Sequence, residues 1–92
     1  MKVKTIFYGI LSEWVGEKEA EFDLPEGATY GLLLKEIGLR FGDIMPRVLW
    51  DPIKNDFSAP VLALGSTGRI NSENSSLDEN EQVTFMLKIG GG

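Results

Sequence analysis

Apolar and polar residues alternate near both ends of the chain, and this pattern most limits the folds that the chain can adopt. Alternation with a period of two is typical of a strand that buries one face. Residues 2–8 show it at the start, residues 17–24 show it most clearly, and residues 82–89 show it again at the end. The first and last strands are expected to pair in parallel, because the long chain between them can supply the crossover that parallel pairing needs.

One long amphipathic helix is predicted between these strands. Thr29 follows a turn and can cap the helix. The apolar residues recur at intervals of three, four and seven and form one stripe: Tyr30, Leu33, Leu34, Ile37 and Phe41. Gly31 and Gly38 each weaken a helix by roughly 1 kcal/mol relative to alanine, so packing must hold it in place. Gly42 is expected to end the helix in a left-handed cap.

Shorter elements fill the rest of the chain. Residues 9–15 predict a short helical turn closed by Gly16. Residues 43–60 contain three prolines but are strongly apolar, which predicts a long loop packed on the body. Residues 61–64 predict a short buried strand, and residues 69–71 predict a hairpin or edge strand.

The order of these elements predicts an α+β domain of the β-grasp class. A mixed sheet of four to five strands would carry one main helix across it. Residues 1–89 are expected to form this single domain, and residues 90–92 are expected to form a flexible C-terminal glycine tail.

The composition argues against several classes of function. The 92 residues include no cysteine and no histidine, which removes thiol nucleophiles, disulfides, imidazole bases and the usual zinc ligands. No cofactor or metal is therefore expected. Fourteen acidic residues against nine basic ones give a net charge of -5, which disfavours nucleic acid and anionic membranes as partners. The apolar run from residue 6 to residue 11 is too short for a signal peptide or a membrane span, so the expected compartment is the cytoplasm.

Three glycines, Gly90, Gly91 and Gly92, follow the last predicted strand. Glycine has no Cβ, so such a run is thin and suits a tail that is threaded into a narrow partner site, with a carboxylate at its tip. The alternative is that small residues collect at a fraying terminus, or that the glycines are an expression scar. Because no other stretch offers reactive chemistry, the tail is the candidate site.

Several stretches of the chain together resemble the MoaD/ThiS family of ubiquitin-like sulfur carriers, and in particular the small subunit of molybdopterin synthase. They are the opening VKTIFYGILSEWVGEKEAEFDLPEG, the helix after it, the LDENEQVTFM stretch and the terminal glycine pair. Leu77, the acidic turn at residues 78–81 and the strand at residues 83–85 match the segment that precedes the tail in the family. Gly91 and Gly92 match the terminal pair, and only residues 43–60 fall outside the likeness.

The resemblance implies a carrier rather than an enzyme. The carboxylate of Gly92 would be adenylated by an E1-like adenylating enzyme and converted to a thiocarboxylate, while Gly91 and Gly90 would let the tip enter the partner's site. The thiocarboxylate would serve the large subunit of molybdopterin synthase or another sulfur-acceptor enzyme. A ubiquitin-like protein modifier and a non-catalytic β-grasp interaction module are the alternatives.

The partner is expected to dock on a sheet surface near the tail. The residues expected to bind it are Met86, Lys88 and Ile89, together with Ile6 and Tyr8. The alternative is that these side chains lie under the packed segment at residues 43–60.

Overall fold

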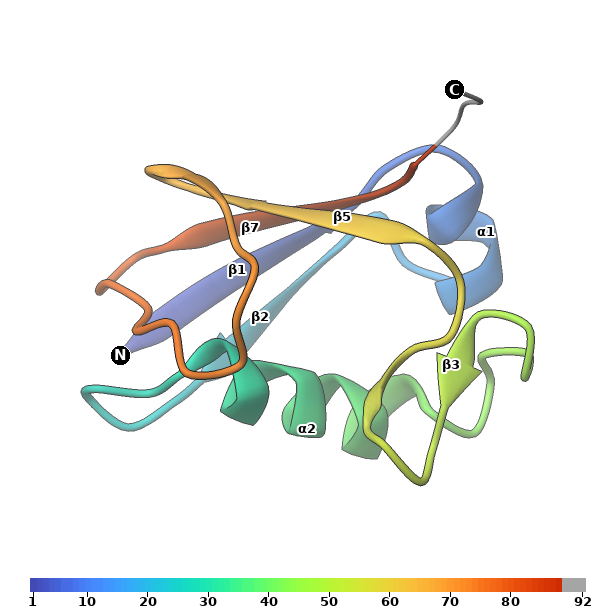
Figure 1. The fold of residues 1–92 in the computed structure, drawn as a ribbon, viewed down its shortest axis with the longest axis horizontal. Helices are drawn as coiled ribbons and strands as arrows, with labels where there is room; N and C mark the ends of the chain where they lie inside the picture. Colours follow the sequence, from blue (N-terminus) through green and yellow to red (C-terminus); the bar gives the residue numbers. More distant parts are fainter. Residues whose placement is uncertain (89–92) are drawn as a thin grey trace.

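The computed structural model describes residues 1–88 of the chain and contains a five-stranded mixed sheet with a helix across one face (Figure 1). The strands of this sheet are β1 (Lys2–Phe7), β2 (Glu19–Asp23), β5 (Val61–Gly65), β6 (Gly68–Arg69) and β7 (Gln82–Leu87). Their order across the sheet is β2-β1-β7-β5-β6. The first and last strands, β1 and β7, pair in parallel, and the other neighbours are antiparallel. The predicted β-grasp class is confirmed.

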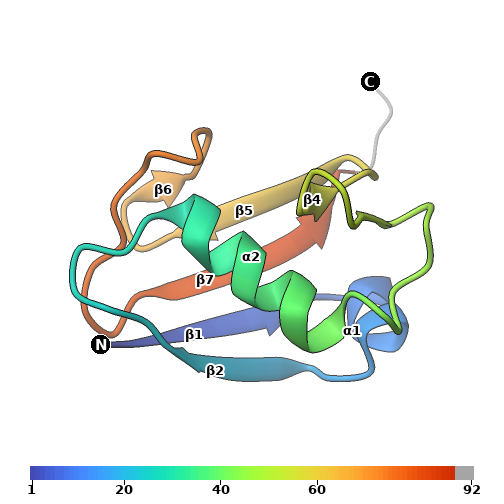
Figure 2. The same ribbon diagram turned by 90° about the horizontal axis from the view of Figure 1, so that it is seen from below.

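The long helix α2 (Tyr30–Phe41) covers the inner face of the sheet (Figure 2). Its first turn is capped by Thr29, whose hydroxyl accepts a hydrogen bond from the Leu32 amide at 3.3 Å. The whole predicted stripe is buried against the sheet: Tyr30, Leu33, Leu34, Ile37 and Phe41. Full burial of a side chain of this size stabilises the fold by about 1.5–3 kcal/mol. Burial of this stripe therefore compensates for the two glycines within the helix.

Close approach of other parts of the chain explains both glycines in α2. A Cβ added at Gly38 would lie 2.9 Å from the ring of Trp50, and one added at Gly31 would lie 3.2 Å from the Cβ of Glu73. The Gly31 amide also donates a hydrogen bond to the Glu73 carbonyl at 2.9 Å. Each glycine therefore admits a neighbouring segment that an alanine would push away.

The predicted left-handed cap at Gly42 is wrong. Gly42 has a φ of -56° and a ψ of -35°, and its amide still donates to the Gly38 carbonyl at 2.8 Å. The chain then makes one more turn, in which the Met45 amide donates to the Phe41 carbonyl. This extra turn buries Met45 in the core, and a left-handed residue at position 42 would have directed the chain elsewhere.

Residues 43–60 pack on the body, as predicted, but they are more than a loop. They contain a small hairpin formed by β3 (Trp50–Asp51) and β4 (Asp56–Phe57). The rings of Trp50 and Phe57 meet edge to face at 5.1 Å between centroids, and Phe57 contacts Phe85 of β7 at 5.2 Å. Strands of two residues are too short to show alternation, which is why the sequence predicted none.

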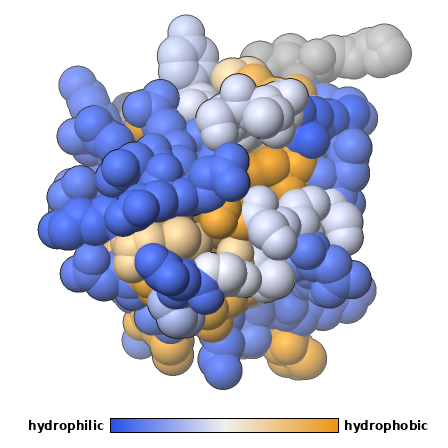
Figure 3. All heavy atoms as spheres, turned by 90° about the vertical axis from the view of Figure 1, so that its left-hand side faces the viewer, coloured by the Kyte–Doolittle hydropathy of each residue, from blue (hydrophilic) through white to orange (hydrophobic). Residues whose placement is uncertain are grey.

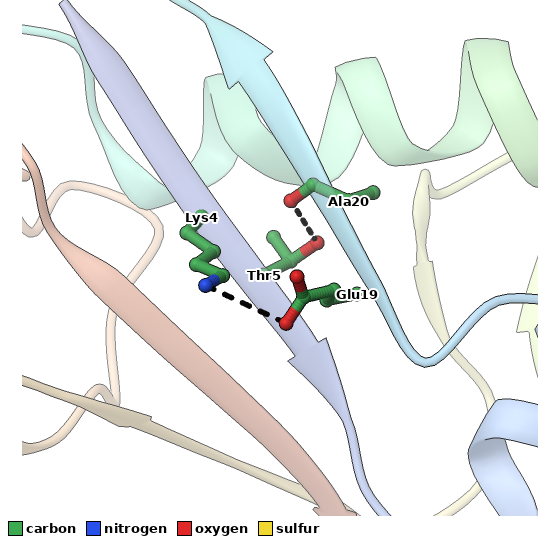
Figure 4. A network of polar contacts seen from close by, with 4 residues as sticks. All are labelled: Lys4, Thr5, Glu19 and Ala20. Carbon is green, nitrogen blue, oxygen red and sulfur yellow. Dashed lines mark hydrogen bonds and ion pairs between the residues drawn. The ribbon is translucent and has the colours of Figure 1, made fainter.

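The acidic residues of β2 (Glu19, Glu21 and Asp23) lie beside lysines of β1 in the strand register, and Figure 4 shows Lys4 directed toward Glu19. Lys4 forms an ion pair with Glu19 at 3.5 Å, and its register partner is Glu21. On the buried side of the same pair, the Thr5 hydroxyl donates to the Ala20 carbonyl at 3.0 Å. These carboxylates thus form a solvated face whose charge is partly neutralised within the sheet.

Glu81 is the one buried carboxylate among residues 1–88, with 6% of its surface exposed. It accepts hydrogen bonds from the amide and hydroxyl of Ser66 and, at 3.0 Å, from the amide of Asp78. Burial by itself raises the pKa of Glu81, but these hydrogen bonds outweigh it and hold the pKa below its ordinary value. Glu81 is therefore ionised, and its hydrogen bonds connect the turn after β5 to the start of β7.

We expect Glu81→Gln to lower the free energy of unfolding at pH 7 by about 1–3 kcal/mol, because the glutamine side chain has no charge and only one acceptor oxygen for the hydrogen bonds from Ser66 and Asp78. A lowered pKa stabilises the fold above the ordinary glutamate value of about 4.3, and this contribution is lost as the pH falls through the native value. In urea unfolding, the difference in free energy of unfolding between wild type and variant should therefore become smaller below about pH 4. Glu79→Gln, at an exposed neighbour, is the matched control, and a gap that stays constant from pH 7 to pH 3 would contradict the assignment.

Candidate carrier site at the end of the last strand

The last strand, β7, brings the chain to the glycine segment from the middle of the sheet, with β1 on one side and β5 on the other. It ends at Leu87, two residues earlier than the predicted limit at residue 89. The amide of Lys88 then donates a hydrogen bond to the Pro60 carbonyl at 2.7 Å, which fixes the last described residue to the body. The predicted site residues Ile89, Gly90, Gly91 and Gly92 lie outside the described residues.

An apolar surface lies on the open face of the sheet, opposite α2, next to the end of β7. The strand register places Leu62 beside Met86, and both Leu64 and Ile6 beside Thr84. Residues that are opposite each other in a sheet share a face. We call the half-exposed side chains Ile6, Leu62, Leu64 and Met86 the open-face patch.

A shallow hollow of about 210 Å³ lies at the edge of the open-face patch, where β7 ends. It is lined by Tyr8, Gly9, Ile10, Met86 and Leu87. Gly9 has a φ of 62°, a conformation that favours glycine, and this residue turns the chain from β1 into the short helix α1 (Ile10–Val15). Tyr8 is 64% exposed, while its amide is fixed to the Phe85 carbonyl at 2.9 Å. The hollow is therefore a mainly apolar recess on an ordered backbone, and it is open to a partner's side chain.

The structure brings three of the residues predicted for docking together. Ile6, Tyr8 and Met86 lie at the same end of the open face, and Lys88 is exposed just beyond β7. The alternative that the segment at residues 43–60 covers them is wrong, because its Phe57 packs on Phe85, whose side chain points to the inner face of β7.

Sequence reasoning missed Leu62, Leu64 and Ile10. Residues 61–64 are wholly apolar, so no alternation shows which of them point outward. Ile10 lies in the predicted helical turn, but its spacing there does not show that it faces outward; it begins α1 and lines the hollow. Met86 is expected on the open face of β7. A known pairing of β5 with β7 would therefore have placed Leu62 and Leu64 on that face as well.

The two buried titratable groups in residues 1–88, Tyr30 and Glu81, are held in forms that serve the fold. Within residues 1–88 no group of three or more potential metal ligands gathers, and no helix there is long and apolar enough to cross a membrane. Burial, and then the negative charges of Asp56 and Glu73, raise the pKa of Tyr30, so its phenol stays protonated and is no nucleophile. Both carboxylate oxygens of Glu81 accept hydrogen bonds within the fold.

No family model matches the sequence, and no curated protein matches it. Solved structures do match. SAMP1 from Haloferax volcanii has a TM-score of 0.78 at 15% identity, covering 100% of both chains. A proposed subunit 1 of molybdopterin converting factor from Pyrococcus furiosus has a TM-score of 0.73 at 23% identity, covering 97% of this chain and 99% of the other.

Urm1 from Trypanosoma brucei is a third structural relative, with a TM-score of 0.65 at 15% identity, covering 99% of this chain and 95% of the other. At such identities the likeness establishes the fold alone. The chain has the ubiquitin-like β-grasp fold that these proteins share, and the resemblance in fold to the MoaD/ThiS type is confirmed.

Proposed function

We propose that this chain is a ubiquitin-like carrier protein that acts through the C-terminal carboxylate of Gly92. In this proposal an E1-like adenylating enzyme activates the carboxylate, and the activated end is converted to a thiocarboxylate that supplies sulfur to a biosynthetic acceptor. The carrier contributes position and shape, and its partners contribute the acids, bases and nucleophiles. A molybdopterin-type pathway is the first candidate, with the large subunit of molybdopterin synthase as the acceptor.

The chemistry requires activation because a carboxylate is a poor acyl donor. An α-carboxyl group is ionised at neutral pH, so an oxygen of Gly92 can attack the α-phosphorus of ATP and displace pyrophosphate. A persulfide sulfur on a partner then attacks the carbonyl carbon of the adenylate, and AMP leaves. A second thiol cleaves the S–S bond of the acyl persulfide, which leaves the thiocarboxylate on the carrier and a disulfide on the partner.

The observation that carries the proposal is the position of β7. A strand at the centre of the sheet leads toward the glycines, and the open-face patch and the hollow lie beside its end. Because an extended residue spans at most about 3.3–3.6 Å, three glycines can reach roughly 10 Å into a buried site. A partner that holds the body through the patch can therefore receive the tip of the tail.

Conjugation to proteins is the second candidate function, and it needs the same adenylate. It is favoured by the full-length likeness in fold to two solved proteins that are named as small archaeal modifiers. Stable adducts on lysines of other proteins would support this route, whereas a free thiocarboxylate would support sulfur transfer. A non-catalytic interaction module predicts neither product.

ATP–pyrophosphate exchange tests the proposal. Each purified E1-like adenylating enzyme of the source organism is mixed with the carrier, ATP and labelled pyrophosphate. Exchange that depends on the carrier is expected with at least one of them, because adenylation is reversible until sulfur arrives. The same reactions without the carrier are the control, and exchange at the control level with every enzyme would contradict the proposal.

Met86→Asp should raise the KM of the carrier in this exchange about tenfold or more, since it places a charge in an apolar contact. The kcat should change little if the contact binds the ground state and the transition state equally. Gln82→Asp is the matched control, because Gln82 lies on the same face of β7 at the far end of the strand. Equal KM values for the two variants would contradict the assignment of the open-face patch.

A further inference from the structure

The segment at residues 43–60 leaves large apolar side chains in solvent although it is firmly packed. Ile53, in the turn of the β3–β4 hairpin, is 89% exposed, and Val48 is 70% exposed. We call these two residues the hairpin rim. Exposed apolar residues are common one at a time, but this ordered segment carries a third, Ile44, which is 60% exposed. Three on one segment beside a candidate site are typical of an interaction surface.

The hairpin rim is fixed to the base of the tail through the backbone. Ser58 donates from its hydroxyl to the Arg47 carbonyl at 2.8 Å and from its amide to the Leu49 carbonyl at 2.7 Å, so it holds Val48 from both sides. Two residues after Ser58, the Pro60 carbonyl accepts the hydrogen bond from Lys88. Two extended residues span at most about 7 Å, so a short, hydrogen-bonded stretch of backbone links the hairpin rim to the end of β7.

The hairpin rim also has a rigid support. Trp50 is buried between Gly38 of α2 and Phe57, and Phe57 contacts Phe85 of β7. A hollow of about 290 Å³ lies beside this support, and Arg47, Ile53 and Ser58 are among its lining residues. The rim thus presents a preformed surface, and a partner would not have to order it.

Both ribbon views place the hairpin, α1 and the end of β7 at one end of the molecule (Figures 1 and 2). Figure 3 shows the opposite end, whose surface is mainly hydrophilic. Most of the strongly exposed large apolar residues lie at the end that carries the hairpin and the end of β7. Tyr8 and Ile10 line the hollow there, and Val48 and Ile53 form the rim.

We infer that the hairpin rim is a second contact for the same enzyme that receives the tail; this inference rests on the proposed function. The four residues after Lys88 span at most about 14 Å when extended, so an enzyme that holds Gly92 must come close to this end of the body. A stable interface covers about 800 Å² on each partner, which is more than a few side chains of the open face provide. The partner surface that fits the rim is apolar, and it grips the carrier on both sides of the point where the tail begins.

The test compares Val48→Asp, Ile53→Asp and the charge-matched control Thr67→Asp in ATP–pyrophosphate exchange with the E1-like enzyme that activates the wild-type carrier. Thr67 is exposed in the turn between β5 and β6, at the opposite end of the molecule. Each rim variant should raise the KM about tenfold with little change in kcat, and the control should stay within about twofold. Thermal unfolding of each variant checks that it is folded, and the two rim variants serve as independent probes.

Other outcomes overturn the inference in distinguishable ways. If both rim variants have the same KM as the control, the inference of a second contact is refuted, and the proposed function is unaffected. If the variants instead abolish concentration-dependent self-association measured by light scattering, the rim is a surface for a second copy of this chain. A wild-type carrier that supports no exchange with any E1-like enzyme would refute the proposed function, and the second contact with it.

Discussion

Deletion of Gly92 is expected to abolish adenylation of the carrier, although the shortened chain still ends in a carboxylate. The deletion shortens the reach of the tail by about 3.3–3.6 Å, and a displacement of the reacting group on this scale costs an enzyme at least 10²-fold in rate. ATP–pyrophosphate exchange by the E1-like enzyme should therefore fall to the level without carrier.

Gly91→Ala is a milder variant that tests the width of the tail rather than its length. It keeps the length of the tail and adds one methyl group, so exchange should be reduced but measurable if the enzyme's channel is narrow. Urea unfolding of both variants beside wild type checks that any loss of exchange does not come from a loss of folding. Normal exchange by the shortened chain would contradict the role given to the length of the tail.

Phe85→Ala should have the largest effect on stability, with a loss of about 3–5 kcal/mol from a total that for small domains is about 5–15 kcal/mol. Phe85 is fully buried, and its ring contacts those of Phe7, Tyr30 and Phe57 at 5.7, 6.3 and 5.2 Å between centroids. The variant therefore loses the contacts that join β1, α2 and the hairpin to β7. Urea unfolding measures the loss.

Tyr8→Ala is the control for this prediction. It removes an aromatic side chain next to the same strand, but the side chain is largely exposed, so the expected loss is within about 0.5 kcal/mol. The same variant should weaken partner binding if the hollow is a contact. A loss in Phe85→Ala no larger than in Tyr8→Ala would contradict the central place of Phe85 in the core.

The regular parts of the fold were predictable because each has a period that the sequence shows. The stripe from Tyr30 to Phe41 marks the buried face of α2, and the alternation in residues 82–87 marks the inner face of β7. The cap at Thr29 was predictable from a local rule. Pairing of β1 with β7 followed from the order of the elements, since the chain between them can make the crossover.

The parts that could not be predicted depend on contacts between distant residues. The conformation of Gly42 follows from the burial of Met45, and the β3–β4 hairpin is held by rings of Trp50 and Phe57 that the sequence does not pair. The same limit applies to the site. Met86 was expected on the open face, but Leu62 joined it only through the register of β5, which a wholly apolar strand does not reveal.

Conversion of the Gly92 carboxylate to a thiocarboxylate can be observed by intact-mass spectrometry. The purified native protein is incubated with ATP, the E1-like enzyme that supports exchange and a persulfide donor, and fragmentation then locates any change. The expected result is a gain in mass equal to the replacement of one oxygen by sulfur, confined to Gly92 and dependent on ATP. An unchanged C-terminal mass, in a reaction where the enzyme adenylates the carrier and the donor is active, would contradict it.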